Sequence, residues 1–195
     1  LTDEAIDQDI MRITDTGDSI HYEHPVDAEK FRSLQKEFDY VYIGAGAQLS
    51  APLEIQGSDV AGVLDPLEFL FGVKQCKKDG IGRNVVIIGG GNTAMDAART
   101  AWRLTGEGGK VTIVYRRTIN EMPADQGEIK SVLEEGVEII ERTAPERIVA
   151  EGGHVKALVC SRMELKGADQ TGRPQPFIIP DSEFEIPCDT IIPAI

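Results

Sequence analysis

A short apolar run, residues 85–88, stops at three glycines and is followed by small residues at helical spacing. This order is typical of a buried strand, a tight turn and the start of a helix. In the pattern Gly-x-Gly-x-x-Gly/Ala, the first glycine makes the turn, the second lets the backbone approach a pyrophosphate, and the last small residue allows close helix–strand packing. The free N–H groups at the helix start also favour phosphate. The candidate dinucleotide-binding residues are therefore Gly89, Gly90, Gly91, Asn92, Thr93 and Ala94.

Two arginines, Arg116 and Arg117, end the next predicted strand, residues 110–115. Domains that bind NAD usually carry Asp or Glu at this place, about 20 residues after the glycines, on the ribose 2′-hydroxyl. No carboxylate stands there, and Glu107 falls in the loop at the opposite end of the sheet. A guanidinium can bind a 2′-phosphate through paired hydrogen bonds. The pair therefore favours NADP over NAD, and the alternative is a solvated basic pair on a loop.

The cysteines and histidines, which could act in catalysis or bind a metal, form no catalytic set. Cys76, Cys160 and Cys188 are far apart and form no Cys-x-x-Cys, which indicates idle thiols in a reducing compartment and a cytoplasmic protein. His21 and His24 stand at odd spacing in a predicted strand and would point to opposite faces. We therefore expect no metal site, no catalytic side chain and no thiol–disulfide reaction within this chain.

Composition narrows the possible partners. The 195 residues are 41% hydrophobic and 27% charged, as in an ordinary soluble globular protein. The apolar runs are too short to cross a bilayer, and no signal-peptide pattern is present. The net charge of −13 disfavours binding to nucleic acid or an anionic membrane. Any anionic ligand must be held by a local basic cluster.

The first fifty residues read as helix, strand, helix and strand. Thr2 and Asp27 are the predicted N-caps of the two helices, and residues 20–24 and 40–43 are the predicted strands. These elements suit one flank of an α/β sheet but are too few for a complete domain. Residues 44–46 are glycine-rich, yet no helix follows them, which excludes a second dinucleotide fingerprint.

Residues 47–64 lack periodicity and contain proline and glycine, which predicts a linker with a domain boundary. A helix capped by Asp65 is expected to run to about Lys78, and Asp125 opens another helix. The whole pattern predicts an α/β fold, a Rossmann-like parallel sheet with a β-meander in three layers. Besides the strands at 85–88 and 110–115, the predicted strands are residues 137–140, 146–150, 155–165, 177–186 and a return strand at 190–192.

Four stretches in this order and spacing resemble a known family. Residues 89–96 (Gly-Gly-Gly-Asn-Thr-Ala-Met-Asp), 99–101, 115–117 and 121–124 resemble the small (β) subunit of NADPH-dependent glutamate synthase and its relatives, including the N-terminal half of dihydropyrimidine dehydrogenase. The resemblance extends over nearly the whole chain. It implies a flavin domain interrupted by an NADPH domain, with hydride passing from the nicotinamide to FAD and electrons leaving through iron–sulfur clusters.

The same resemblance implies further residues and a domain plan. Gly44, Ala45 and Gly46 occupy the family's Ala-Thr-Gly segment near the flavin, although glycine and alanine replace the family's alanine and threonine. The implied plan is a partial flavin-domain segment at 1–52, an NADP(H)-binding domain at 53–188 and the start of a return to the flavin domain at 189–195. We therefore expect a fragment of a longer reductase whose partners are flavin and iron–sulfur domains or a larger catalytic subunit.

Three functions remain open from the sequence. The favoured one is the NADPH-binding part of a flavin-dependent oxidoreductase, because hydride transfer needs positioning of two cofactors rather than a protein acid or base. A non-enzymatic NADP(H)-sensing or regulatory module is the second. Another Rossmann enzyme, such as a methyltransferase, is the third, and for it the arginine pair has no purpose.

Overall fold

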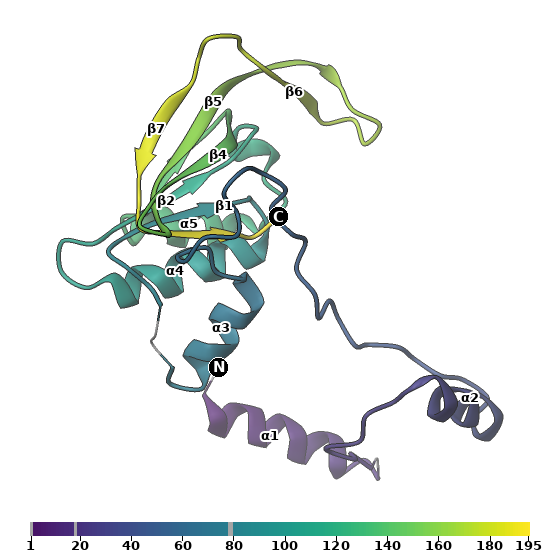
Figure 1. Ribbon diagram of the computed structural model, residues 1–195. Coiled ribbons are helices and arrows are strands. Elements are labelled where there is room, and N and C mark those ends of the chain that lie inside the picture. The colour runs from purple at the N-terminus through teal and green to yellow at the C-terminus, as the bar shows by residue number, and fades with distance from the viewer. Residues whose placement is uncertain (1, 18, 78–79) are drawn as a thin grey trace. The chain divides into compact units, whose positions relative to one another are not determined.

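The computed structural model describes residues 2–17, 19–77 and 80–195 of the chain (Figure 1). The chain divides into two compact units, Leu1–Gly46 and Ala47–Ile195. The second unit holds all the strands that the structure describes. Within the described residues, no helix is long and apolar enough to cross a membrane.

The first unit contains two helices, α1 (Asp3–Thr14) and α2 (Ala28–Glu37). The predicted caps are confirmed: the Thr2 side chain accepts a hydrogen bond from the Ala5 N–H, and the Asp27 carboxylate accepts one from the Lys30 N–H. Each cap satisfies an N–H that has no partner inside its helix. These local signals were sufficient to place both helix starts.

The two strands expected in the first unit, residues 20–24 and 40–43, are absent. Tyr40 is 94% exposed, and no other segment of this unit that the structure describes offers a strand to pair with it. An isolated strand leaves its backbone groups unpaired, so an alternating pattern alone does not make one. The expected separation of His21 and His24 is also wrong, because their ring centroids lie 6.1 Å apart in irregular chain.

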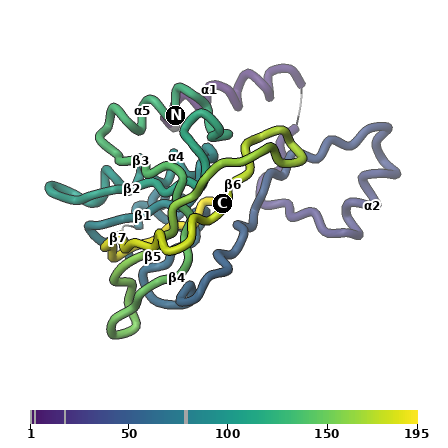
Figure 2. Tube along the Cα trace, turned by 90° about the horizontal axis from the view of Figure 1, so that it is seen from above, coloured from purple at the N-terminus to yellow at the C-terminus, as the bar shows by residue number. Residues whose placement is uncertain are grey.

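A parallel sheet of four strands is the centre of the second unit, in the order β3-β2-β1-β8 (Figures 1 and 2). Its strands are β1 (Asn84–Ile88), β2 (Lys110–Val114), β3 (Glu138–Ile140) and β8 (Thr190–Pro193). In β1 the four residues after Asn84 are buried, as expected for a strand covered on both faces. The return strand expected at 190–192 is β8, which pairs with β1 at the edge of this sheet.

Three helices cover one face of the parallel sheet: α3 (Pro66–Lys74), α4 (Asn92–Thr105) and α5 (Gln126–Glu134). Alanines on α4 are fully buried against the strands, and their small size permits the close approach. The predicted caps Asp65 and Asp125 both accept backbone N–H bonds. The helix α3 ends at Lys74, earlier than expected, and Lys78 lies outside the described residues.

An ion-pair network joins α4 to α5. The Arg99 guanidinium lies 2.7 Å from the Glu128 carboxylate and 2.9 Å from that of Glu135, which also pairs with Arg103. The hydrogen bond from Arg99 lowers the pKa of Glu135 against the opposing effect of desolvation. Arg99, part of the sequence motif at 99–101, therefore ties two helices together.

The opposite face of the parallel sheet is covered by an antiparallel sheet, which completes the three predicted layers (Figure 1). Its strands are β4 (Thr143–Glu151), β5 (His154–Ala168), β6 (Pro174–Ile178) and β7 (Phe184–Pro187). The single strand expected at 177–186 is therefore wrong. A turn with Asp181 at φ 55° separates β6 from β7, and both pair with different parts of β5.

The segment at 47–64 is not a free linker. Its Leu53 is 8% exposed and packs in the core between the two sheets. Backbone bridges pair Gln56 with Arg147 of β4 and Val63 with Ile191 of β8. Irregular chain thus contributes to the second unit by hydrogen bonding to strand edges, which periodicity cannot reveal.

Candidate functional site

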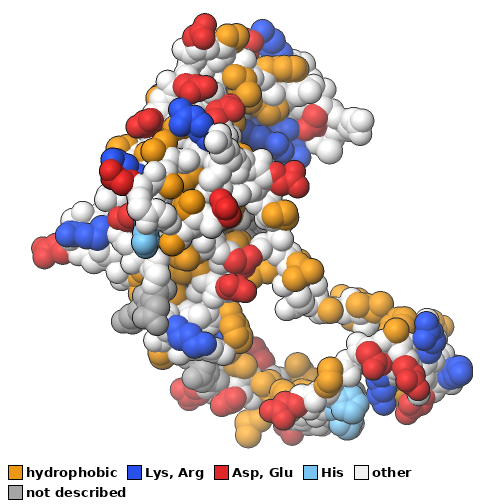
Figure 3. Space-filling view, viewed as in Figure 1, with side chains coloured by type: hydrophobic (Ala, Val, Ile, Leu, Met, Phe, Trp, Pro, Cys, Tyr) orange, Lys and Arg blue, Asp and Glu red, His pale blue; other side chains and the backbone are white. Residues whose placement is uncertain are grey.

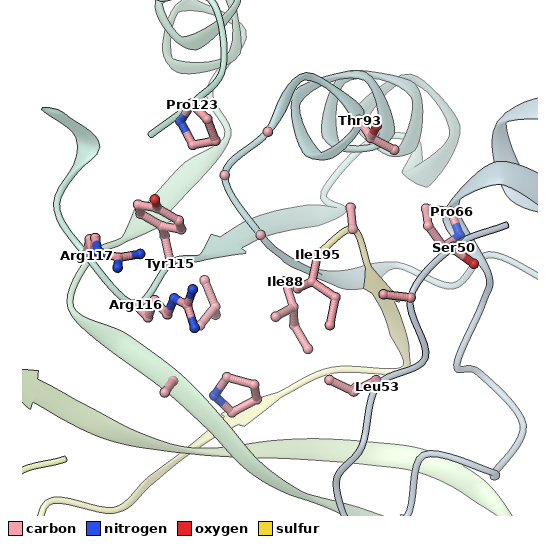
Figure 4. Close-up of a pocket in the computed structure, with 18 of the residues that line it drawn as sticks. Ser50, Leu53, Pro66, Ile88, Thr93, Tyr115, Arg116, Arg117, Pro123 and Ile195 are labelled. Carbon is pink, nitrogen blue, oxygen red and sulfur yellow. The ribbon is translucent and has the colours of Figure 1, made fainter. Parts of the chain in front are cut away.

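A cavity of about 610 Å³ opens at the carboxyl ends of β1 and β2, within the second unit (Figure 4). This is where open α/β sheets bind their ligands. Figure 4 shows Tyr115, Arg116 and Arg117 on one side of the cavity, and Ser50 and Pro66 on the other. Residues far apart in the sequence therefore converge on one space.

The three glycines of the turn are required for different reasons. Gly89 has φ 140°, and a Cβ there would lie 2.0 Å from the Ala194 carbonyl oxygen. A Cβ on Gly90 would lie 2.6 Å from the Tyr115 ring. Gly91 has an ordinary φ of −88°, and a Cβ there would meet nothing within 4 Å. Only Gly91 therefore leaves open space beside the backbone, as close approach of a ligand requires.

The start of α4 presents unpaired donors. The N–H groups of Ala94 and of the next residue already bond the Gly91 carbonyl. In the part of the chain that the structure describes, the N–H groups of Gly90, Gly91, Asn92 and Thr93 have no protein acceptor. A helix N-terminus also carries a partial positive charge, which suits a phosphate.

The six predicted residues of the glycine region take different positions. Gly89, Gly90, Gly91 and Thr93 line the cavity. The Ala94 side chain is fully buried in the core against β1, as close packing requires. The Asn92 side chain is absent from the cavity wall, and its Oδ1 accepts the Asp125 N–H at 2.9 Å.

The loop that contains residues 121–124 braces the glycine turn, a role that its sequence did not indicate. The Ala124 N–H donates to the Gly90 carbonyl at 3.1 Å. The Tyr115 hydroxyl donates to the Glu121 carbonyl at 2.9 Å, which holds the ring against Gly90. The sequence signal available here is the position of the motif soon after β2, which places the loop at the same end of the sheet as the glycine turn.

The two arginines after β2 differ in environment. Arg116 is exposed and lines the cavity, and no hydrogen bond or ion pair joins its guanidinium to other described residues. Arg117 is 3% exposed, and its Nε donates to the Pro174 carbonyl at 2.7 Å. Its Nη2 also pairs with Asp169 at 2.7 Å. The adjacent positions are therefore not equivalent.

Asp169, the partner of Arg117, is held as a carboxylate. The pKa of Asp169 is lowered to about 2, chiefly by the hydrogen bond from the Thr171 hydroxyl, against the opposing effect of desolvation. The N–H groups of Thr171 and Arg173 and the charge of Arg117 lower it further. Arg173 is 42% exposed at its side chain and lines the same cavity as Arg116. Sequence reasoning missed both residues because they lie more than fifty positions after the arginine pair.

The cavity is basic although the chain is acidic. Three arginines line it, and no Asp or Glu of the described residues does. A cluster of Lys or Arg side chains is visible just below the hairpin of β5 and β6 (Figure 3). Because the chain as a whole carries a net charge of −13, this local group of arginines makes the cavity the favoured place for an anion.

The remaining sequence-predicted residues lie elsewhere. Gly44, Ala45 and Gly46 belong to the first unit, where they are exposed and outside regular secondary structure. Cys160 and Cys188 are buried, and desolvation raises the pKa of each thiol to about 12. Among the described residues, no group of three or more His, Cys, Asp or Glu could hold a metal ion.

A family model described as pyridine nucleotide-disulphide oxidoreductase matches residues 4–195. The chain belongs to this family. It is 37% identical over 195 residues to the NADPH-Fe(3+) oxidoreductase subunit beta of Geobacter sulfurreducens, covering 97% of this chain and 29% of that protein. It is 32% identical over 172 residues to the glutamate synthase [NADPH] small chain of Halomonas elongata, covering 83% of this chain and 36% of that one.

Solved structures support the fold assignment. Mycobacterium tuberculosis FprA in complex with NADPH superposes with a TM-score of 0.67 at 19% identity, covering 84% of this chain and 51% of FprA. The predicted resemblance to the glutamate synthase small subunit is confirmed by the named relative, and the matching family is one of pyridine nucleotide oxidoreductases. The chain spans about 29% of the length of the first relatives it matches.

Proposed function

We propose that the second unit is the NADPH-binding part of a longer flavin-dependent oxidoreductase. One observation carries the proposal: the glycine turn, the start of α4 and a set of arginines open on a single cavity that no carboxylate of the described residues lines. A dinucleotide that carries an additional phosphate matches this distribution of charge. Relatives whose names contain NADPH support the choice of nucleotide.

Each part of the nucleotide has a proposed place. The pyrophosphate lies against Gly91 and the free N–H groups at the start of α4, where the backbone is open. The 2′-phosphate lies at Arg116, the exposed arginine after β2. The brace from Ala124 to Gly90 keeps the turn in shape before the ligand arrives.

The chemistry comes from the cofactors. When NADPH is bound beside FAD, its nicotinamide supplies a hydride to the flavin, and the protein needs only to position the two rings. We propose that residues 53–188 form the NADP(H) domain, with β8 completing its parallel sheet where the chain leaves it. We further propose that residues 1–52 and 189–195 lead to the flavin domain on either side, and that Gly44, Ala45 and Gly46 lie near the flavin. Iron–sulfur clusters held by another part of the protein or by a larger subunit would accept the electrons from the reduced flavin.

The test is titration calorimetry of the protein with NADPH and with NADH, using the wild type, Arg116→Ala and Lys130→Ala. A charge-assisted contact contributes about 1.5–3 kcal/mol, so we expect NADPH to bind roughly 10- to 150-fold more tightly than NADH. Arg116→Ala should remove most of this preference. Lys130 is an exposed residue of α5 and its replacement controls for loss of one positive charge. Equal wild-type affinities would contradict the proposal.

A further inference from the structure

We infer that Arg173 is the second guanidinium for the 2′-phosphate and that Arg117 is a positioning residue which holds Arg173 in place. The inference rests on the proposed function, since it concerns the same nucleotide site. It assigns a role in nucleotide specificity to the hairpin of β5 and β6. The sequence alone suggests the adjacent pair Arg116 and Arg117 for this role instead.

Arg117 also lines the cavity, but the protein already holds most of its guanidinium. Its side chain is 4% exposed, and two of its nitrogens already bond the hairpin, at the Pro174 carbonyl and the Asp169 carboxylate. A bidentate contact with a phosphate would require its Nε or Nη2 and would therefore break one of these two bonds. Breaking buried charge-assisted bonds costs more than an exposed contact returns. Arg117 is therefore committed to the protein.

The hairpin depends on Arg117 for its position. Beyond Arg162, strand β5 pairs only with β6, because its pairing with β4 and β7 ends there. Figure 1 shows the hairpin projecting from the sheet. In the part of the chain that the structure describes, the hydrogen bonds from residues 164–178 to the rest of the unit are the two made by Arg117. Arg117 is thus the clamp between the end of β2 and the hairpin tip.

Asp169 passes this restraint on to Arg173. Its Oδ2 binds Arg117, while its Oδ1 accepts the Arg173 N–H at 3.1 Å and the Thr171 N–H at 2.8 Å. The Asp169 N–H also donates to the Arg173 carbonyl at 2.8 Å. The backbone of Arg173 is therefore fixed by the same carboxylate that Arg117 holds.

The Arg173 guanidinium remains available for a ligand. Its Nε donates to the Thr171 hydroxyl at 3.1 Å and lies 4.0 Å from Asp169, but its two Nη atoms have no hydrogen-bond partner among the described residues. It lines the same cavity as Arg116. A phosphate monoester carries a charge of about −1.5 to −2 at pH 7, which two guanidiniums match better than one.

The test measures NADPH and NADH affinities of the protein by calorimetry for Arg173→Ala, Asp169→Asn, the double variant and Lys166→Ala. Arg173→Ala should weaken NADPH binding about tenfold or more and leave NADH binding unchanged. Lys166→Ala removes a charge of the same sign from the same hairpin, outside the cavity wall, and should change neither affinity. Equilibrium unfolding of each variant checks that the fold is retained.

The positioning role requires coupling between the two residues. Asp169→Asn should weaken NADPH binding in the wild type but have no further effect in the Arg173→Ala variant, because its effect passes through Arg173. Additive effects would overturn the positioning role. An unchanged NADPH preference in Arg173→Ala, with the preference lost in Arg116→Ala, would overturn this inference and leave the proposed function standing. A protein that binds neither nucleotide would overturn the proposed function and the inference with it.

Discussion

Two residues of the glycine turn differ in why glycine is needed: Gly89 for the fold, and Gly91 for binding of a ligand. Gly89 and Gly91 are equivalent letters of one sequence pattern, yet only Gly89 has a positive φ and a carbonyl oxygen against its missing side chain. Gly91 has neither constraint. Since the folded chain tolerates a methyl group at Gly91, a requirement for glycine there must come from a ligand.

Replacing these two glycines by alanine tests the distinction. Gly89→Ala should lower the free energy of unfolding by about 3 kcal/mol, because it combines backbone strain with a clash at Ala194. Gly91→Ala should change that free energy by less than about 1 kcal/mol but weaken NADPH binding, since the methyl group would occupy the space proposed for the pyrophosphate. Urea unfolding and NADPH titration of both variants provide the two measurements. A Gly91→Ala variant with wild-type NADPH affinity would place the pyrophosphate elsewhere.

At the scale of elements, the sequence predicted helix starts correctly, because a helix cap depends only on residues close to it in the chain. The caps Thr2, Asp27, Asp65 and Asp125 were identified because each satisfies N–H groups within its own helix. The strand expected at 40–43 failed because a strand needs a neighbour, which no local pattern provides.

The candidate site was predictable in part for the same reason. The glycine turn and Arg116 could be identified, because a strand followed by a turn positions them directly. The difference between Arg116 and Arg117 could not, since it depends on a hairpin that returns fifty residues later and brings Asp169 to Arg117. The prediction also joined β6 and β7 into one strand, although Pro180, Asp181 and Ser182 between them are turn-forming residues.

The hairpin should become less stable in acid. The pKa of Asp169, about 2, lies below its ordinary value of 3.8, so its carboxylate stabilises the fold fully above about pH 4. That contribution is lost as the pH falls from about 4 toward 2, when Asp169 is protonated. The free energy of unfolding should therefore differ between wild type and Asp169→Asn by a constant amount above about pH 4, and by less below it. Urea unfolding between pH 2.5 and 7, with carboxyl NMR titration of Asp169, measures both quantities. A difference that stays constant to pH 2.5 would contradict this assignment.

At the scale of the whole molecule, the two units contain glycine-rich segments in different structural surroundings. The second unit has a strand, a glycine turn and a helix, and the turn lines a cavity. In the first unit, Gly44–Gly46 follows irregular chain, and the segment after it, residues 47–64, contains no helix. A dinucleotide pyrophosphate needs the N–H groups of a helix start, and of these two glycine-rich segments the one in the second unit provides them.

The 195-residue chain, purified alone, should therefore bind NADPH but retain no stoichiometric FAD. Among the described residues, the one strand–turn–helix unit of this kind lies at the basic cavity, where arginines favour a nucleotide with a 2′-phosphate, and FAD has none. Gly44, Ala45 and Gly46 would give at most a secondary contact to a flavin held by other residues. The absorbance spectrum of the purified chain, together with circular dichroism to verify its fold, measures the flavin content. A folded chain with one flavin per molecule would contradict this prediction and would show that the segments at 1–52 and 189–195 suffice for FAD.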